Sequence, residues 1–196
     1  MIDDLDKTLE RLLRHELPTN LVGEHSISFA SPDTEFPPTS VTLPAIDLFL
    51  YDVRENTDLR DPGWQMERTS DGRVRKQRAP VRVDCSYLVT AWANDSNDEH
   101  RLLGEVMRVL LRHPTIPEAV LQGSLQSQRL PPPTCSIQQS QLQSWGDFWQ
   151  AIGGKPKAAL NYTVTIGVDL HEPIDAGVPV VDTQLGFMDV GDEVTP

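Results

Sequence analysis

The sequence lacks any long hydrophobic run, and no apolar stretch approaches the roughly 18 residues that would span a membrane as a helix. Residues Met1–Asp6 are acidic and contain no apolar segment of the kind that a secretory signal needs, so we expect no such signal. Aromatic residues make up only 6% of the 196 residues, while 38% are hydrophobic and 23% are charged. These values exclude an integral membrane protein and most fully disordered chains, and they predict one globular domain with a substantial core.

Cysteine is scarce, with Cys85 and Cys135 standing fifty positions apart. Neither thiol has a second Cys or His two to four residues away, which is the spacing of zinc-binding pairs, so we expect no metal and no cofactor. The pattern favours two reduced structural thiols in a cytoplasmic protein, with a disulfide as the alternative.

Positively charged residues are also few. The chain has 17 Lys and Arg residues and 29 Asp and Glu residues, which gives a net charge of -12. A chain this acidic is repelled by phosphate backbones. We therefore expect no nucleic-acid partner.

The familiar catalytic motifs are missing: G-x-S-x-G, H-E-x-x-H, G-x-G-x-x-G and a phosphate-binding glycine loop do not occur. We interpret His100, beside Asp98 and Glu99, as part of a first helical turn and not as a metal cluster, because adjacent helical residues do not share a face. Asp47 and Asp52 lie five positions apart on one predicted strand and point to opposite faces. We interpret them as two solvated strand-end carboxylates and not as an acid–base pair, and we expect no enzymatic activity.

Helical periodicity predicts three amphipathic helices. The first covers residues 2–17 and stops at Pro18, with acidic residues in its first turn and basic residues in its last. The second begins after capping residues in 94–97 and runs to about Arg112, and the third covers 145–152. The predicted apolar stripes are Ile2, Leu5, Leu9, Leu12 and Leu13 in the first helix, Leu103, Val106, Met107 and Leu110 in the second, and Trp145, Phe148 and Trp149 in the third.

Alternating apolar and polar residues predict the strands. The clearest are 81–93 and 160–170, and 45–53 has apolar residues on both faces, which indicates cover on both sides. Shorter candidates are 25–30, 118–125 and 137–142.

A basic segment lies within this acidic chain. Residues 64–78 are predicted to form a hairpin arm, because Asp71-Gly72 is a strong turn signal between two strand-like runs. Within 68–82 the only acidic residue is Asp71. The segment is either a solvated hairpin or a docking surface for an acidic partner. Its predicted interface residues are Arg68, Arg73, Arg75, Lys76, Arg78 and Arg82.

The C-terminal segment, residues 171–196, has the opposite character, with no Lys or Arg and six carboxylates. It is a disordered terminus, a segment packed on its own domain, or an extended arm that lies against a neighbouring subunit or the terminal sheath layer. Its predicted interface residues are Asp182, Asp189, Asp192 and Glu193. We therefore predict two parts, a domain at 1–170 that includes the hairpin arm and an acidic arm at 171–196.

Four blocks of sequence carry a family resemblance. They are Ile46-Asp47-Leu48-Phe49-Leu50-Tyr51-Asp52-Val53-Arg54-Glu55-Asn56, Arg78–Trp92 (RAPVRVDCSYLVTAW), Glu99–Gly104 (EHRLLG) and the stretch from Trp149 to Tyr162. From about residue 1 to 172 the chain resembles the cap, or tail terminator, of phage-tail-like contractile injection systems. Two parts depart from the family pattern, the proline-rich segment 31–44 and the acidic C-terminal segment.

The resemblance implies an α/β (α+β) fold, a mainly antiparallel sheet with an N-terminal helix and one long central helix packed on it. It implies a structural protein that forms a hexameric ring, ends the inner tube and anchors the last sheath layer. The implied partners are further copies of the chain, the inner tube protein and the sheath protein, with no direct membrane insertion. The protein would be assembled in the cytoplasm as part of an injection particle.

Two alternatives remain open at this stage. A monomeric adaptor or assembly chaperone for a tail or tube protein would share the same sequence features. A small α/β enzyme is the other, since fold alone does not decide function.

Overall fold

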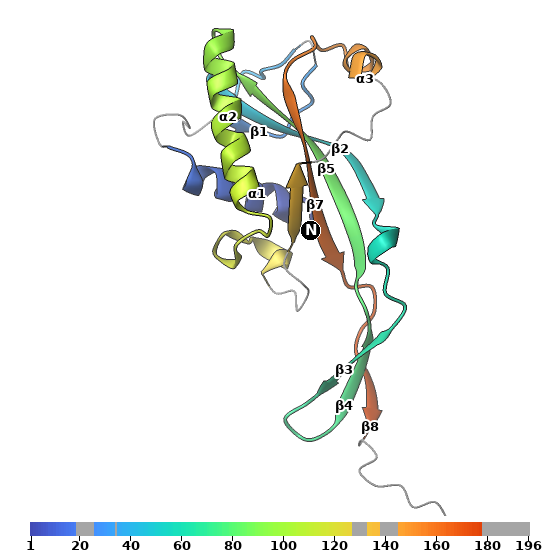
Figure 1. Ribbon diagram of the computed structural model, residues 1–196. Helices are drawn as coiled ribbons and strands as arrows, with labels where there is room; N and C mark the ends of the chain where they lie inside the picture. Colours follow the sequence, from blue (N-terminus) through green and yellow to red (C-terminus); the bar gives the residue numbers. More distant parts are fainter. Residues whose placement is uncertain (19–25, 34, 127–132, 138–144, 178–196) are drawn as a thin grey trace, which may run out of the picture. The chain divides into compact units, whose positions relative to one another are not determined.

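The computed structural model describes residues 1–18, 26–33, 35–126, 133–137 and 145–177 (Figure 1). The chain divides into two compact units, which we call the main unit (Met1–Asp61 and Pro80–Asp169) and the hairpin unit (Pro62–Ala79 and the chain from Leu170). The main unit contains α1 (Ile2–Glu16), β1 (Ile27–Ser28), β2 (Ala45–Glu55), β5 (Val81–Trp92), α2 (Ser96–Arg112), β6 (Thr134–Ile137), α3 (Trp145–Ala151) and β7 (Ala159–Val168). It also contains three short 3₁₀ helices, η1 (Thr57–Leu59), η2 (Glu118–Val120) and η3 (Gly123–Leu125).

The main unit is built on a five-stranded sheet in the order β1-β2-β5-β7-β6. β1 runs parallel to β2, and the other neighbouring pairs are antiparallel. The long strand β5 lies at the centre, where Tyr87 is paired with Leu50 on one side and with Tyr162 on the other. The predicted α+β class with a mainly antiparallel sheet is confirmed.

Both long helices bury an apolar stripe in one core against the sheet. In α1 the buried leucines are Leu5, Leu9, Leu12 and Leu13, as predicted, whereas Ile2 is largely exposed at the end of the helix. In α2 the predicted stripe is partly wrong, because Met107 is 39% exposed. The buried residues of α2 are Leu102, Val106, Val109 and Leu110, so the helix is turned so that Met107 faces outward.

Side-chain hydrogen bonds cap α2 and attach α1 to the sheet. Asp95 caps α2 by accepting from the backbone N–H groups of Asn97 and Asp98. The Tyr87 hydroxyl donates to Asp6 at 2.8 Å and so joins α1 to β5.

Residues 118–125 were predicted as a strand, and that prediction is wrong. The segment forms η2 and η3 and lies against α1. Thr8 accepts from the backbone N–H of Gln122, and Asp4 accepts from the backbone N–H and the hydroxyl of Ser124. In this segment, backbone N–H groups donate to side chains of α1, whereas in a strand they would donate to the backbone of a neighbouring strand.

The sheet register also decides the state of the two cysteines. Cys85 on β5 and Cys135 on β6 both lie opposite Val164 of β7, so the two thiols are separated by a whole strand. Two strand spacings amount to roughly 10 Å, beyond the Cα separation of about 7 Å that a disulfide tolerates. Both cysteines are free, and burial raises the pKa of each thiol to about 11.

The opposite face of the sheet is lined by small polar residues. Ser86 and Thr163 are hydrogen-bonded at 3.2 Å, and the Tyr51 hydroxyl donates to Asn161. The short helix α3 places Phe148 beside Tyr51, at 6.1 Å between ring centroids. Trp149 is buried as predicted, while the side chain of Trp145 and residues 138–142 of the predicted strand 137–142 lie outside the described residues.

The hairpin unit holds a separate three-stranded sheet in the order β3 (Trp64–Arg68), β4 (Val74–Arg78) and β8 (Ile174–Gly177). Gly72 takes the turn with φ at +81°, a conformation that favours glycine, and so confirms the turn that Asp71-Gly72 predicts. β8, from the acidic segment, pairs with β4 of its own chain. The hairpin and residues 170–177 therefore belong to one compact unit.

Candidate interaction surfaces

The predicted basic residues of the hairpin lie on two different faces of its sheet. Arg73 forms an ion pair with Asp175 of β8, and Arg75 lies opposite both Asp175 and Glu67. These contacts place positive and negative charges together. The pKa of Asp175 is lowered, mainly by the hydrogen bond from the Gly177 backbone N–H and further by the charge of Arg73. This face of the sheet is largely neutralised within the chain.

On the other face, two cations lie over one aromatic ring. The Lys76 ammonium is 5.0 Å and the Arg78 guanidinium 4.4 Å from the centroid of the Trp64 ring. Arg78 also donates to the backbone carbonyl of Pro62 at 2.9 Å. Cation–π contacts of this kind hold long side chains in place without neutralising their charge, so this face stays cationic.

Arg82 does not belong to this group. It lies on β5 in the main unit and is only 9% exposed, although the sequence grouped it with the hairpin arginines. One of its terminal nitrogens, Nη1, is buried and has no hydrogen-bond partner in the described part of the chain. The acidic residues predicted to complement the arm, Asp182, Asp189, Asp192 and Glu193, lie outside the described residues.

Asp47 corrects another prediction, since it is fully buried and not solvated. It lies on β2 between Ser28 of β1 and Thr90 of β5, in the middle of three strands. Burial raises the pKa of Asp47 to about 8, an effect that the nearby Ser28 hydroxyl offsets only in part. Neither carboxylate oxygen has a hydrogen bond of good geometry to another described residue. Asp52, by contrast, is partly exposed and pairs with Arg54.

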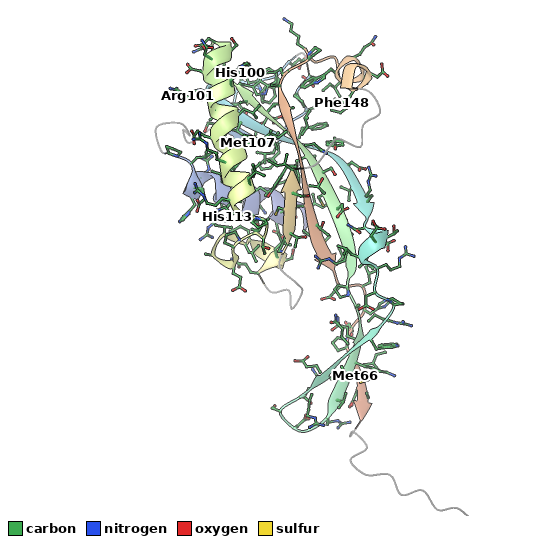
Figure 2. All side chains as sticks on the ribbon, in the orientation of Figure 1. Met66, His100, Arg101, Met107, His113 and Phe148 are labelled. Carbon is green, nitrogen blue, oxygen red and sulfur yellow. The ribbon has the colours of Figure 1, made fainter. Side chains whose placement is uncertain are left out.

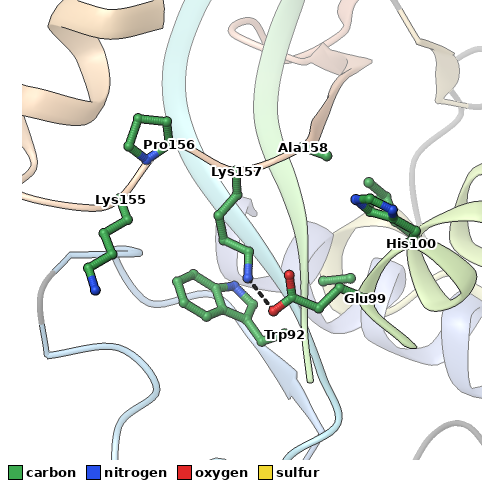
Figure 3. Close-up of a pocket in the computed structure, with 9 residues that line it drawn as sticks. Trp92, Glu99, His100, Lys155, Pro156, Lys157 and Ala158 are labelled. Atoms are coloured by element: carbon green, nitrogen blue, oxygen red, sulfur yellow. Dashed lines mark hydrogen bonds and ion pairs between the residues drawn. The ribbon is translucent and has the colours of Figure 1, made fainter. Parts of the chain in front are cut away.

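A cleft of about 380 Å³ lies between the start of α2, the end of β5 and the segment before β7 (Figure 3). Lys157 forms an ion pair with Glu99 at 2.5 Å and lies 3.9 Å from the centroid of the Trp92 ring. Glu99 also accepts from the backbone N–H of Ala93. This cluster holds the segment before β7 against β5 and α2. The sequence carried no motif for it, because Lys157 lies 58 positions from Glu99 along the chain.

His100 lines the same cleft and is exposed, as expected for a residue of the first helical turn. Within residues 1–18, 26–33, 35–126, 133–137 and 145–177, no group of three or more His, Cys, Asp or Glu side chains is arranged to hold a metal ion. No helix of this described part is long and apolar enough to cross a membrane.

The family follows from a comparison of sequences. The profile of the Pvc16 N-terminal domain matches residues 4–183, which is nearly the whole chain. This chain belongs to the Pvc16 N-terminal domain family. No curated protein matches the chain in sequence.

Two solved structures share the fold of this Pvc16 N-terminal domain. One is the PVC sheath/tube terminator, in the extended state, of an extracellular contractile injection system, with 24% identity over 97% of this chain and a TM-score of 0.68. The other is the tube-terminating cap of the anti-feeding prophage, with 22% identity over 95% of this chain and a TM-score of 0.62. The chain spans 64% and 61% of the lengths of these two proteins. The tail-terminator family expected from the sequence blocks is confirmed.

Proposed function

We propose that this protein is the structural cap of a contractile injection system. In this role it ends the inner tube, contacts the last layer of the sheath and carries out no catalysis. The observation that supports the proposal most directly is the family match over residues 4–183, together with a fold shared with one sheath/tube terminator and one tube-terminating cap.

The proposed working form is a ring of six copies. A cyclic ring uses a heterologous contact, in which each subunit presents two different patches that fit the patches of its neighbours. The hairpin unit supplies one candidate patch, because its residues 62–79 carry five of the chain's 17 Lys and Arg residues. An acidic patch of the same chain would supply the other. The particle that this ring closes would be assembled in the cytoplasm.

Deleting the gene tests the capping role. Without a terminator, tube growth has no fixed end, so we expect sheathed particles of irregular length or no stable particles, as seen by electron microscopy. Complementation with the intact gene is the control. Normal particles of uniform length in the deletion strain would refute the proposal.

The mass of the purified protein in solution tests the ring separately. A mass of six chains at micromolar concentration supports it, whereas a persistent monomer would favour an assembly adaptor.

A further inference from the structure

One face of the hairpin unit combines exposed apolar side chains with cations. In the β3–β4 pair, Trp64 lies opposite Arg78 and Met66 opposite Lys76, and β8 places Ile174 opposite Lys76. Residues directly opposite each other in an antiparallel pair project from the same face. We call this surface the Trp64 face; it consists of Trp64, Met66, Arg68, Val74, Lys76, Arg78 and Ile174.

The apolar side chains of the Trp64 face are not covered by the described part of the chain. Trp64 is 41% exposed, Met66 74% and Ile174 51%, and Figure 2 labels Met66 on β3. No residue of β3, β4 or β8 is buried. A sheet of this size is stable on its own only when its apolar face packs against another element. We therefore expect a partner to cover the Trp64 face.

The charges define what that partner must carry. Among the described residues, Arg68, Lys76 and Arg78 form no ion pair with a carboxylate, and two of them flank the Trp64 ring. The opposite face already has the Arg73–Asp175 pair. The Trp64 face therefore fits a segment that is both apolar and acidic.

The chain itself contains such a segment. Residues 178–196 have no Lys or Arg and carry four carboxylates. Its large apolar residues are Val178, Val180, Val181, Leu185, Phe187, Met188, Val190 and Val194. We propose that the Trp64 face binds residues 178–196 of a second copy of this chain.

The proposed ring is the reason to choose a second copy. A cyclic ring needs two different patches that meet between neighbouring subunits, and the cationic Trp64 face and the acidic residues 178–196 are two such patches. Gly177 ends β8 opposite Val74 and has a φ of +82°, a conformation that suits a reversal of the chain. Binding to the same chain is therefore the competing arrangement, and the experiment below distinguishes the two. The contact is heterologous, and it deepens the proposed ring by naming the two surfaces that meet.

Disulfide trapping between full-length chains tests this contact. One tagged chain carries Met66→Cys and a differently tagged chain carries Phe187→Cys; the interchain disulfide is measured by mass spectrometry after mild oxidation. Gln65→Cys is the matched control, because Gln65 is exposed on the same strand and lies on the opposite face. The wild-type thiols give the background, which should be low because Cys85 is buried and the raised pKa of both native thiols leaves little thiolate.

We expect at least about fivefold more disulfide with Met66→Cys than with Gln65→Cys, a ratio that corresponds to ~1 kcal/mol. Adding Lys76→Glu and Arg78→Glu to the Met66→Cys chain should lower the yield by a similar factor. Equal yields from Met66→Cys and Gln65→Cys would overturn the proposal. So would a disulfide found only within one chain when both cysteines are placed in it. If the wild-type chain forms a ring but Met66→Cys and Gln65→Cys give equal disulfide yields, the proposed contact is wrong and the proposed cap function is unaffected.

Discussion

Asp47 offers the sharpest test of the main unit, because its carboxyl group is fully buried between β1 and β5 and lacks a well-formed hydrogen bond among the described residues. Its pKa of about 8 in the folded protein compares with 3.8 when solvated. The folded state therefore holds this proton more tightly than the unfolded state does. Its contribution to stability is complete below about pH 4 and is lost as the pH rises toward 8.

The size of the effect follows from the pKa difference. Each pH unit between the two pKa values changes the free energy of unfolding by about 1.4 kcal/mol. Between pH 5 and pH 7.5, the wild type should lose about 3 kcal/mol through this group alone. Asp47→Asn removes the ionisation and keeps the shape, so it should remove that loss.

Urea denaturation of wild type and Asp47→Asn at pH 5 and pH 7.5 gives the comparison. Asp52→Asn on the same strand is the matched control, since Asp52 is partly exposed and paired with Arg54. We expect the stability of Asp47→Asn relative to wild type to rise by about 3 kcal/mol between the two pH values, and that of Asp52→Asn to stay nearly constant. Parallel profiles for wild type and Asp47→Asn would show that Asp47 is ionised in the fold, and the reasoning would be wrong.

Three further predictions concern the joints between elements and the hairpin unit. Tyr87→Phe removes the hydrogen bond to Asp6 that joins α1 to β5 and should cost about 1 kcal/mol of unfolding free energy, measured by urea denaturation; an unchanged midpoint would contradict this. Truncation after Glu172 removes β8, so light proteolysis should cut the remaining hairpin faster than in the full chain, and sheath anchoring or ring stability should be lost; truncated caps that hold tube and sheath normally would leave the segment without a role. Replacing four hairpin cations with Glu should reduce ring formation at physiological salt while circular dichroism stays that of a folded protein, and intact rings would rule out the arm as an interface. The four cations are Arg73, Arg75, Lys76 and Arg78.

Much of the fold could be predicted from the sequence because its signals are local. Strict alternation predicted β5 and β7, and the leucine spacing predicted α1. The Asp71-Gly72 turn predicted the β3–β4 hairpin for the same reason. In α1, β5 and β7 the pattern that forms the element also defines its buried face, and in the hairpin the turn residues alone bring the two strands together, so no distant contact was needed.

The errors arose where distant contacts decide the outcome. Residues 118–125 look like a strand in isolation, but side chains of α1 more than a hundred positions away supply their hydrogen bonds. Asp47 was taken as solvated because its burial depends on the pairing of β2 with β1 and β5, and no local pattern shows which strands will become neighbours. Lys157, Glu99 and Trp92 form one cluster only because the sheet brings their segments together.

The make-up of the hairpin unit has a consequence for the order in which the protein is made. Two of its strands, β3 and β4, are synthesised before most of the main unit, but β8 follows the last strand of that unit, β7. All helices and strands of the main unit are therefore synthesised before the third strand of the hairpin unit exists, although only five residues separate β7 from β8. Chains interrupted in this interval carry a core and only a two-stranded hairpin, which is marginal alone in water. If the hairpin unit forms a joint of the ring, only chains made through residue 177 can enter it, and the fold itself excludes unfinished subunits from assembly.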